Sequence, residues 1–153
     1  MFAAAIFGLS LASAPHLFSA VQKDKEKDLK DIKRQLEGVW IVTAEMFNGS
    51  EAARDELKGL SVFVKGNTIT FRGSTVRGEA TWTVDTSKNP CHIDITFTSE
   101  PLKGEKKLGI LKLDGDAMTL CVDASGKGRP DRFESPAGSE YMLHVHRRDK
   151  KEK

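Results

Sequence analysis

Hydrophobic and polar positions alternate from residue 40 onward, and this period of two predicts β-strands rather than helices. In the first run, Trp40, Val42, Ala44 and Met46 share one phase, so the sequence predicts that these four side chains face the same side of a strand. Comparable runs follow at short intervals, separated by turn residues such as Gly, Asn, Asp and Pro. The predicted strands cover residues 40–46, 61–65, 68–72, 79–85, 91–97, 107–113, 117–122 and 140–147.

A different period precedes the strands. Leu29, Ile32 and Leu36 recur at helical spacing within residues 24–37, and Gly38 follows as a helix-ending residue. The sequence therefore predicts one short helix that leads into the first strand.

The arrangement of about eight short strands without intervening helices favours a closed, up-and-down antiparallel β-barrel. Closure removes the exposed strand edges that a flat sheet would leave. A β-sandwich is the alternative that the same spacing allows. Either way the fold class is all-β, with a single N-terminal helix.

The first 22 residues contain no Lys, Arg, Asp or Glu, whereas the following stretch is almost wholly charged. This change predicts a signal peptide over residues 1–20, a barrel domain over 24–148 and a charged tail over 149–153. We therefore expect an exported protein of the periplasm, the cell envelope or the extracellular space. An uncleaved anchor is the alternative, but Pro15 and His16 interrupt the apolar stretch, and we expect no membrane span in the mature chain.

Composition narrows the functional classes. The chain has 153 residues, of which 39% are hydrophobic and 30% charged, as expected for one ordinary globular domain. Its 24 basic and 22 acidic residues give a formal charge of +2, which is too balanced to predict a nucleic-acid partner. The sequence does not indicate any protein partner.

Several segments together resemble a known family. A glycine two residues before a tryptophan, as in Gly38-Val39-Trp40, is typical of the opening of lipocalin-like barrels. Other segments of the chain extend the similarity: Leu57-Lys58-Gly59-Leu60, Thr86-Ser87-Lys88-Asn89-Pro90, Leu113-Asp114-Gly115-Asp116 and Arg129-Pro130. Together they resemble a family of small exported lipocalin-like domains, known mainly as an uncharacterised domain of planctomycete bacteria. The resemblance implies a lipocalin-like barrel with no assigned substrate, cofactor or catalytic residue.

The resemblance also implies a structural motif at the closed end of the barrel. In lipocalins, the tryptophan of the Gly-x-Trp motif lies under an arginine of the last strand. Carried over to this chain, Gly38 and Trp40 would form the motif with Arg147, or with the neighbouring Arg148. Such a cation–π contact contributes about 1 kcal/mol when it is partly desolvated.

The two cysteines of an exported protein could form a disulfide. Cys91 begins one predicted strand and Cys121 ends the next strand but one, with opposite phases, so we expect them to lie too far apart for a bridge.

His144 and His146 are the strongest candidates for a metal site in the sequence. Alternate residues of a strand point to one face, so their two imidazoles could bind the same metal ion. A third ligand is missing nearby, and His92 lies on another strand. We therefore expect no metal site and two histidines on the outer face, with Tyr141, Leu143 and Val145 pointing inward.

No catalytic motif is present, so we do not expect an enzyme, and we expect no cofactor. Two hypotheses remain. The first is a binding module that holds one small hydrophobic molecule inside the barrel. The second is a filled barrel that acts as a structural or protein-interaction module. The predicted lining consists of Phe71, Trp82, Ile95, Phe97, Ile110, Met118, Leu120, Tyr141 and Leu143.

Overall fold

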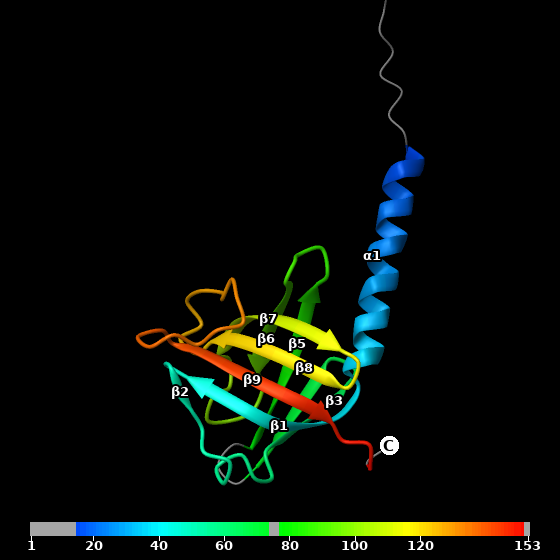
Figure 1. The fold of residues 1–153 in the computed structure, drawn as a ribbon. Coiled ribbons are helices and arrows are strands. Elements are labelled where there is room, and N and C mark those ends of the chain that lie inside the picture. The colour runs from blue at the N-terminus through cyan, green and yellow to red at the C-terminus, as the bar shows by residue number, and fades with distance from the viewer. Residues whose placement is uncertain (1–14, 74–76, 152–153) are drawn as a thin grey trace, which may run out of the picture.

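A closed antiparallel β-barrel with one helix forms the protein in a computed structural model that describes residues 15–73 and 77–151 (Figure 1). Within these residues, nine strands follow one helix. The elements are α1 (Pro15–Leu36), β1 (Gly38–Phe47), β2 (Ser50–Glu51), β3 (Ser61–Lys65), β4 (Thr68–Arg72), β5 (Gly78–Asp85), β6 (Cys91–Phe97), β7 (Lys106–Asp114), β8 (Ala117–Asp123) and β9 (Tyr141–Arg148).

The strand order confirms the predicted lipocalin-like, up-and-down barrel. From β3 to β9 each strand pairs with the next, β1 pairs with β3, and β9 pairs back with β1 to close the sheet. The two-residue β2 only extends β1 at a hairpin, so eight strands form the barrel itself. Asn48 and Gly49 make that hairpin with positive φ angles, as expected for a tight turn.

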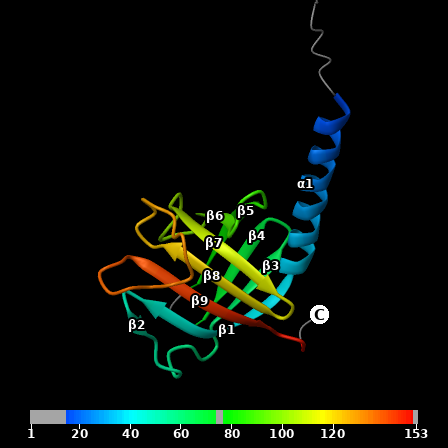
Figure 2. The ribbon, with the colours of Figure 1, turned by 45° about the horizontal axis from the view of Figure 1, so that its top comes forward.

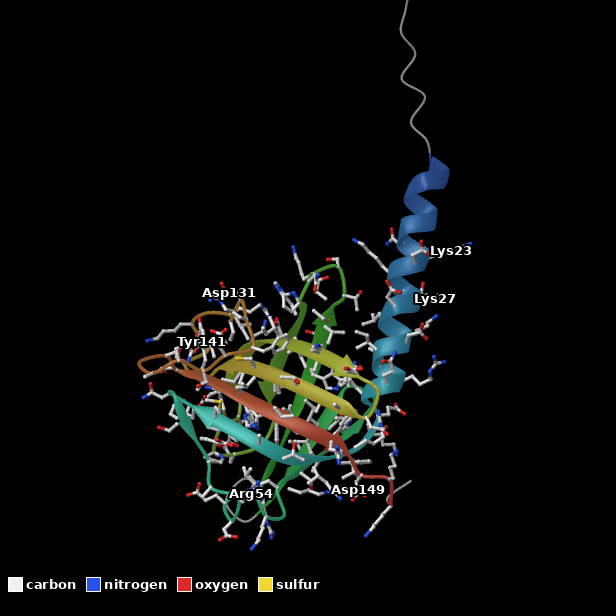
Figure 3. The ribbon with its side chains drawn as sticks, viewed as in Figure 1. Lys23, Lys27, Arg54, Asp131, Tyr141 and Asp149 are labelled. Atoms are coloured by element: carbon white, nitrogen blue, oxygen red, sulfur yellow. The ribbon has the colours of Figure 1, made fainter. Side chains whose placement is uncertain are left out.

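Helix α1 runs away from the barrel, and only its C-terminal end packs against the core (Figure 2). Leu36 is buried and Ile32 is partly buried against the core cluster, whereas residues 22–28 are all exposed. Lys23 and Lys27 accordingly lie on the projecting part of the helix (Figure 3). The helix begins at Pro15, nine residues before its predicted start. Residues 15–20 of the predicted signal peptide are therefore helical, and residues 1–14 lie outside the described part of the chain.

Trp40 and Arg148 close the end of the barrel where α1 meets β1. Trp40 is fully buried and its Nε1 donates a hydrogen bond of 2.8 Å to the carbonyl of Leu36. The guanidinium carbon of Arg148 lies 4.2 Å from the centroid of the Trp40 ring, and Arg148 also donates to the carbonyls of Glu37 and Gln35. These bonds satisfy carbonyls at the end of the helix, where a positive charge is favourable.

The arginine of this motif is therefore Arg148, and the choice of Arg147 is wrong. Arg148 pairs with Trp40 across β1 and β9, so both side chains point inward, whereas Arg147 pairs with Ile41 on the exposed outer face. Gly38 supports the same contact, because its φ of +115° suits glycine and an added Cβ would lie only 3.2 Å from Nη1 of Arg148.

We expect the substitution Arg148→Ala to lower the free energy of unfolding by about 2 kcal/mol, because it removes charged hydrogen bonds and a cation–π contact. The matched control, Arg147→Ala, should change it by no more than about 0.5 kcal/mol, since Arg147 is exposed. Denaturant unfolding of both variants provides the comparison. Equal losses for the two would show that Arg148 does not hold this end of the barrel.

A β-bulge in β1 changes which side chains face the barrel interior. The pairing with β9 shifts register between Val42 and Ala44, so Glu45 follows Val42 on the inner face. The prediction that Ala44 and Met46 share the face of Trp40 is therefore wrong. Before the bulge, the predicted phase of Trp40 and Val42 is confirmed, because both are buried.

Residues 124–140 pack over the outer face of β8 and its neighbours. Pro130 is fully buried in this segment, as are Cys121 and Ile110 of the strands beneath it. The Cys121 thiol donates to the carbonyl of Glu134 at 3.4 Å, and Arg129 donates to the carbonyl of Ile93 at 2.8 Å. This cover creates a second, smaller apolar layer outside the barrel.

The two cysteines are free thiols, Cys91 on β6 and Cys121 on β8, with β7 between them. Cys91 is partly exposed, while Cys121 is buried on the outer face beside Ile110. Burial raises the pKa of the Cys121 thiol to about 11, which makes it a poor nucleophile.

Candidate ligand-binding cavity

The barrel interior contains a cavity of about 120 Å³. Its wall is formed mainly by inward side chains of the barrel strands, together with Leu36 at the end of α1 and Leu60 just before β3. Most of the wall is apolar. The lining residues are Leu36, Val42, Glu45, Leu60, Ser61, Val62, Val64, Ile69, Phe71, Arg72, Trp82, Ile93, Ile95, Leu111, Met118, Leu120, His144 and His146.

Five of the nine residues predicted to line the interior do so: Phe71, Trp82, Ile95, Met118 and Leu120. Each lies on a strand whose apolar and polar positions alternate with little ambiguity, so its phase could be predicted. Whether these residues bind a ligand stays a prediction.

The other four lie elsewhere. Phe97 packs against the core cluster and stacks on Phe71, with 5.5 Å between ring centroids, but does not line the cavity. Ile110, Tyr141 and Leu143 lie on the outer face, and their predicted inward orientation is wrong. The same correction applies to Val145, which lies between the inward His144 and His146. Ile110 and Leu143 flank Cys121 in the sheet, so the layer covered by residues 124–140 accounts for their hydrophobic character. Figure 3 shows Tyr141 at the start of β9, on the same side of the molecule as Asp131 of that segment.

His144 and His146 point into the cavity, which corrects the prediction of two outer-face histidines. His146 pairs with Met118 and with Val42, and His144 pairs with Leu120, all of which line the interior. The rings stack with 5.8 Å between their centroids. Burial lowers the pKa of His144 to about 4 and that of His146 to about 3, so both are uncharged at neutral pH.

Glu45 lies beside the histidines on β1. Its Oε2 is 3.4 Å from Nδ1 of His144, and about a quarter of the Glu45 side chain is exposed (26%). Burial raises the pKa of the Glu45 carboxyl, and the nearby charge of Glu56 adds to the effect. Glu45 and His144 therefore form one polar side of a mostly apolar wall.

Two buried polar atoms in the cavity wall have no hydrogen-bond partner within the described part of the chain. They are Nε1 of Trp82 and Nδ1 of His146, whose side chains belong to residues only 2% and 3% exposed. Leaving such groups unpaired costs about 1–3 kcal/mol each, and native proteins normally pair them with protein, water or ligand. These atoms mark where a bound molecule would find hydrogen bonds.

Metal binding needs more ligands than the cavity wall provides within the described residues. In residues 15–73 and 77–151, no group of three or more His, Cys, Asp or Glu side chains is placed to hold a metal ion. Zinc in proteins takes three or four such ligands. The two histidines and Glu45 are therefore polar groups of the cavity wall that do not form a metal-binding cluster in the described part of the chain.

Comparison with protein-family models, with curated proteins and with solved structures gave no match to this chain. The resemblance to the planctomycete domain family therefore stays a prediction. In the described part of the chain, no helix has the length and apolar character needed to cross a membrane.

Sequence reasoning missed the inward position of Glu45, His144 and His146. The sequence does contain one signal for the histidines. If Arg148, and not Arg147, packs on Trp40, then alternation along β9 places both imidazoles on the inner face as well. The position of Glu45 had no such signal, because nothing in the local sequence marks a bulge after Val42.

Proposed function

We propose that this protein binds one small, largely apolar molecule inside its β-barrel. The observation that carries the proposal is the cavity of about 120 Å³, whose apolar wall contains two buried polar atoms without partners. Small-molecule sites have this composition: mostly apolar surface with a few polar groups that fix orientation. The closed sheet holds the wall in place before any ligand arrives.

The volume limits the ligand to about one ring. A dry engineered cavity of about 150 Å³ accepts benzene, so a cavity of comparable size suits a single-ring compound rather than a fatty acid or a large cofactor. Arg72 at the end of β4 is exposed, which places that side of the cavity nearest to solvent.

The competing hypothesis is a filled barrel that acts as a structural or interaction module. It predicts an interior occupied by side chains, with no space for a ligand. The cavity favours the binding module over this alternative, since Phe71, Trp82 and Leu120 surround open volume instead of filling it.

Calorimetric titration with toluene tests the proposal. We expect saturable binding to the unmodified chain, and at least about a tenfold loss of affinity in Leu120→Phe, because the larger side chain occupies cavity volume. Leu143→Phe is the matched control: the same substitution one strand away, on the outer face, should leave affinity unchanged. An unmodified chain that does not bind toluene, or equal effects of the two substitutions, would contradict a site inside the barrel.

We further propose that the protein works outside the cytoplasm, with residues 1–20 acting as an export signal. The absence of charged residues from the first 22 positions supports this. A mature protein recovered from the cell envelope or medium should lack these residues by intact mass. Full-length chain found only in the cytoplasm would contradict the proposal.

A further inference from the structure

The unpartnered atoms in the cavity wall define the hydrogen bonds that a ligand must supply. Nε1 of Trp82 carries a hydrogen and can only donate. A neutral imidazole donates through one nitrogen and accepts through the other, so the role of Nδ1 in His146 depends on which nitrogen carries the proton.

His146 is uncharged, so its Nδ1 can take either role toward a bound group. Nδ1 of His146 is buried and has no partner among the described residues, and the same holds for Nε1 of Trp82. The wall thus offers one donor, on Trp82, and one nitrogen of His146 that can donate or accept.

We propose that the ligand is an uncharged, single-ring molecule bearing a hydroxyl or amide group, which accepts from Trp82 Nε1 and forms a second hydrogen bond with His146 Nδ1. This inference rests on the proposed function and narrows it. A hydroxyl or a primary or secondary amide is the smallest group that both donates and accepts. The ring fills the apolar part of the cavity beside Phe71, Ile95 and Leu120.

The charges around the cavity disfavour an anionic ligand of the same size. Both histidines are neutral at pH 7, and the acidic group that faces the interior is Glu45, next to His144. An anion would meet this carboxylate in a mostly apolar environment, and the cation that lines the cavity, Arg72, lies at its exposed rim. Arg72, at the rim, lies over the Phe63 ring with 5.2 Å to its centroid.

Phenol and toluene are matched probes, because they have nearly the same shape and differ in the hydroxyl. A purely apolar cavity would favour toluene, since the hydroxyl of phenol must leave water. We expect the opposite at pH 7: phenol should bind about tenfold more tightly than toluene, as two satisfied buried hydrogen bonds allow. In His146→Phe this preference should reverse while toluene still binds. His92→Phe, the same substitution on the outer face of β6, should keep the preference for phenol.

The outcomes separate the two proposals. Toluene binding that equals or exceeds phenol binding would overturn the assignment of ligand class and leave the barrel as a binding site. If neither probe binds, both proposals fail, and ordered water satisfies the two buried atoms. If His146→Phe does not fold, nuclear magnetic resonance of the unmodified chain gives the same test. The ¹⁵N resonance of Nδ1 in His146 should shift when phenol is added but not when toluene is added. A resonance that phenol leaves unchanged would overturn the assignment of ligand class.

Discussion

Replacing Trp40 by alanine is expected to lower the free energy of unfolding by about 3–5 kcal/mol, the usual cost of deleting a large buried aromatic side chain. Trp40 has no exposed surface, and it links three parts of the fold. Its ring contacts the core, its Nε1 bonds the carbonyl of Leu36 at the end of α1, and its face supports Arg148. The midpoint of denaturant unfolding measures the loss.

Ile41→Ala is the control for this prediction. Ile41 is adjacent in sequence, belongs to the same strand and is 40% exposed on the outer face, so its truncation should cost well under 1 kcal/mol. Combining Trp40→Ala with Arg148→Ala should cost less than the sum of the single losses, since the two residues share one contact. A Trp40→Ala variant as stable as the unmodified chain would show that the closed end is not organised around this ring.

Acidification from pH 7 to pH 5 is expected to lower the free energy of unfolding by roughly 3 kcal/mol, through the buried histidines. In the folded protein the pKa values of His144 and His146 are about 4 and about 3. In the unfolded chain both are near the ordinary value of about 6.5. As the pH falls below 6.5, the two histidines become protonated in the unfolded chain but stay neutral in the folded barrel. The stability that is present at neutral pH is therefore lost progressively as the pH falls toward the folded pKa values.

Glu45 acts in the opposite direction. Because burial raises its pKa, the folded state takes up a proton before the unfolded state does, and this offsets part of the loss as the pH falls. The two histidines dominate, since their pKa shifts are large and add in the same direction.

Denaturant unfolding at several pH values between 5 and 7.5 measures the effect. His146→Phe should remove about half of the pH dependence in this window, whereas His92→Phe should leave it unchanged. A flat stability profile for the unmodified chain would mean that the imidazoles are hydrated and titrate as if exposed.

Much of the fold could be predicted from the sequence because most of its turns are short and most of its strands keep one phase. The hairpin of β3 and β4 carries Gly66 at its turn with a positive φ, and the hairpin of β7 and β8 carries Gly115 in the same role. Residues such as these fix strand boundaries locally, without information from the rest of the chain.

The composition of the cavity wall could only partly be predicted, because two strands depart from simple alternation. In β1 the bulge after Val42 turns Glu45 inward, and a bulge depends on pairing with a distant strand. In β9 Leu143 is apolar and His144 is polar, yet His144 faces the interior. Alternation indicates which face is more apolar, and it misleads when polar side chains line the interior and a loop covers the outside.

The covering segment explains the error at Ile110 in the same way. Ile110 is one of the most deeply buried residues, as expected for a lining side chain, but it is buried by residues 124–140 and not by the opposite wall of the barrel. Pro130 in that segment is fully buried as well. Segments that contain Gly, Ser and Pro usually form exposed loops, so the sequence gives little indication that this one packs against the outer face of a strand.

Isotope-filtered nuclear Overhauser spectroscopy with phenol bound to methyl-labelled protein tests the central claim, that the barrel interior is the binding site. The account predicts contacts from the phenol ring protons to the methyl groups of Ile95, Met118 and Leu120, which line the cavity. It predicts none to Ile110, which lies under the outer loop. Contacts confined to Ile110 or other outer-face methyl groups, or the absence of any contact at saturating phenol, would contradict it.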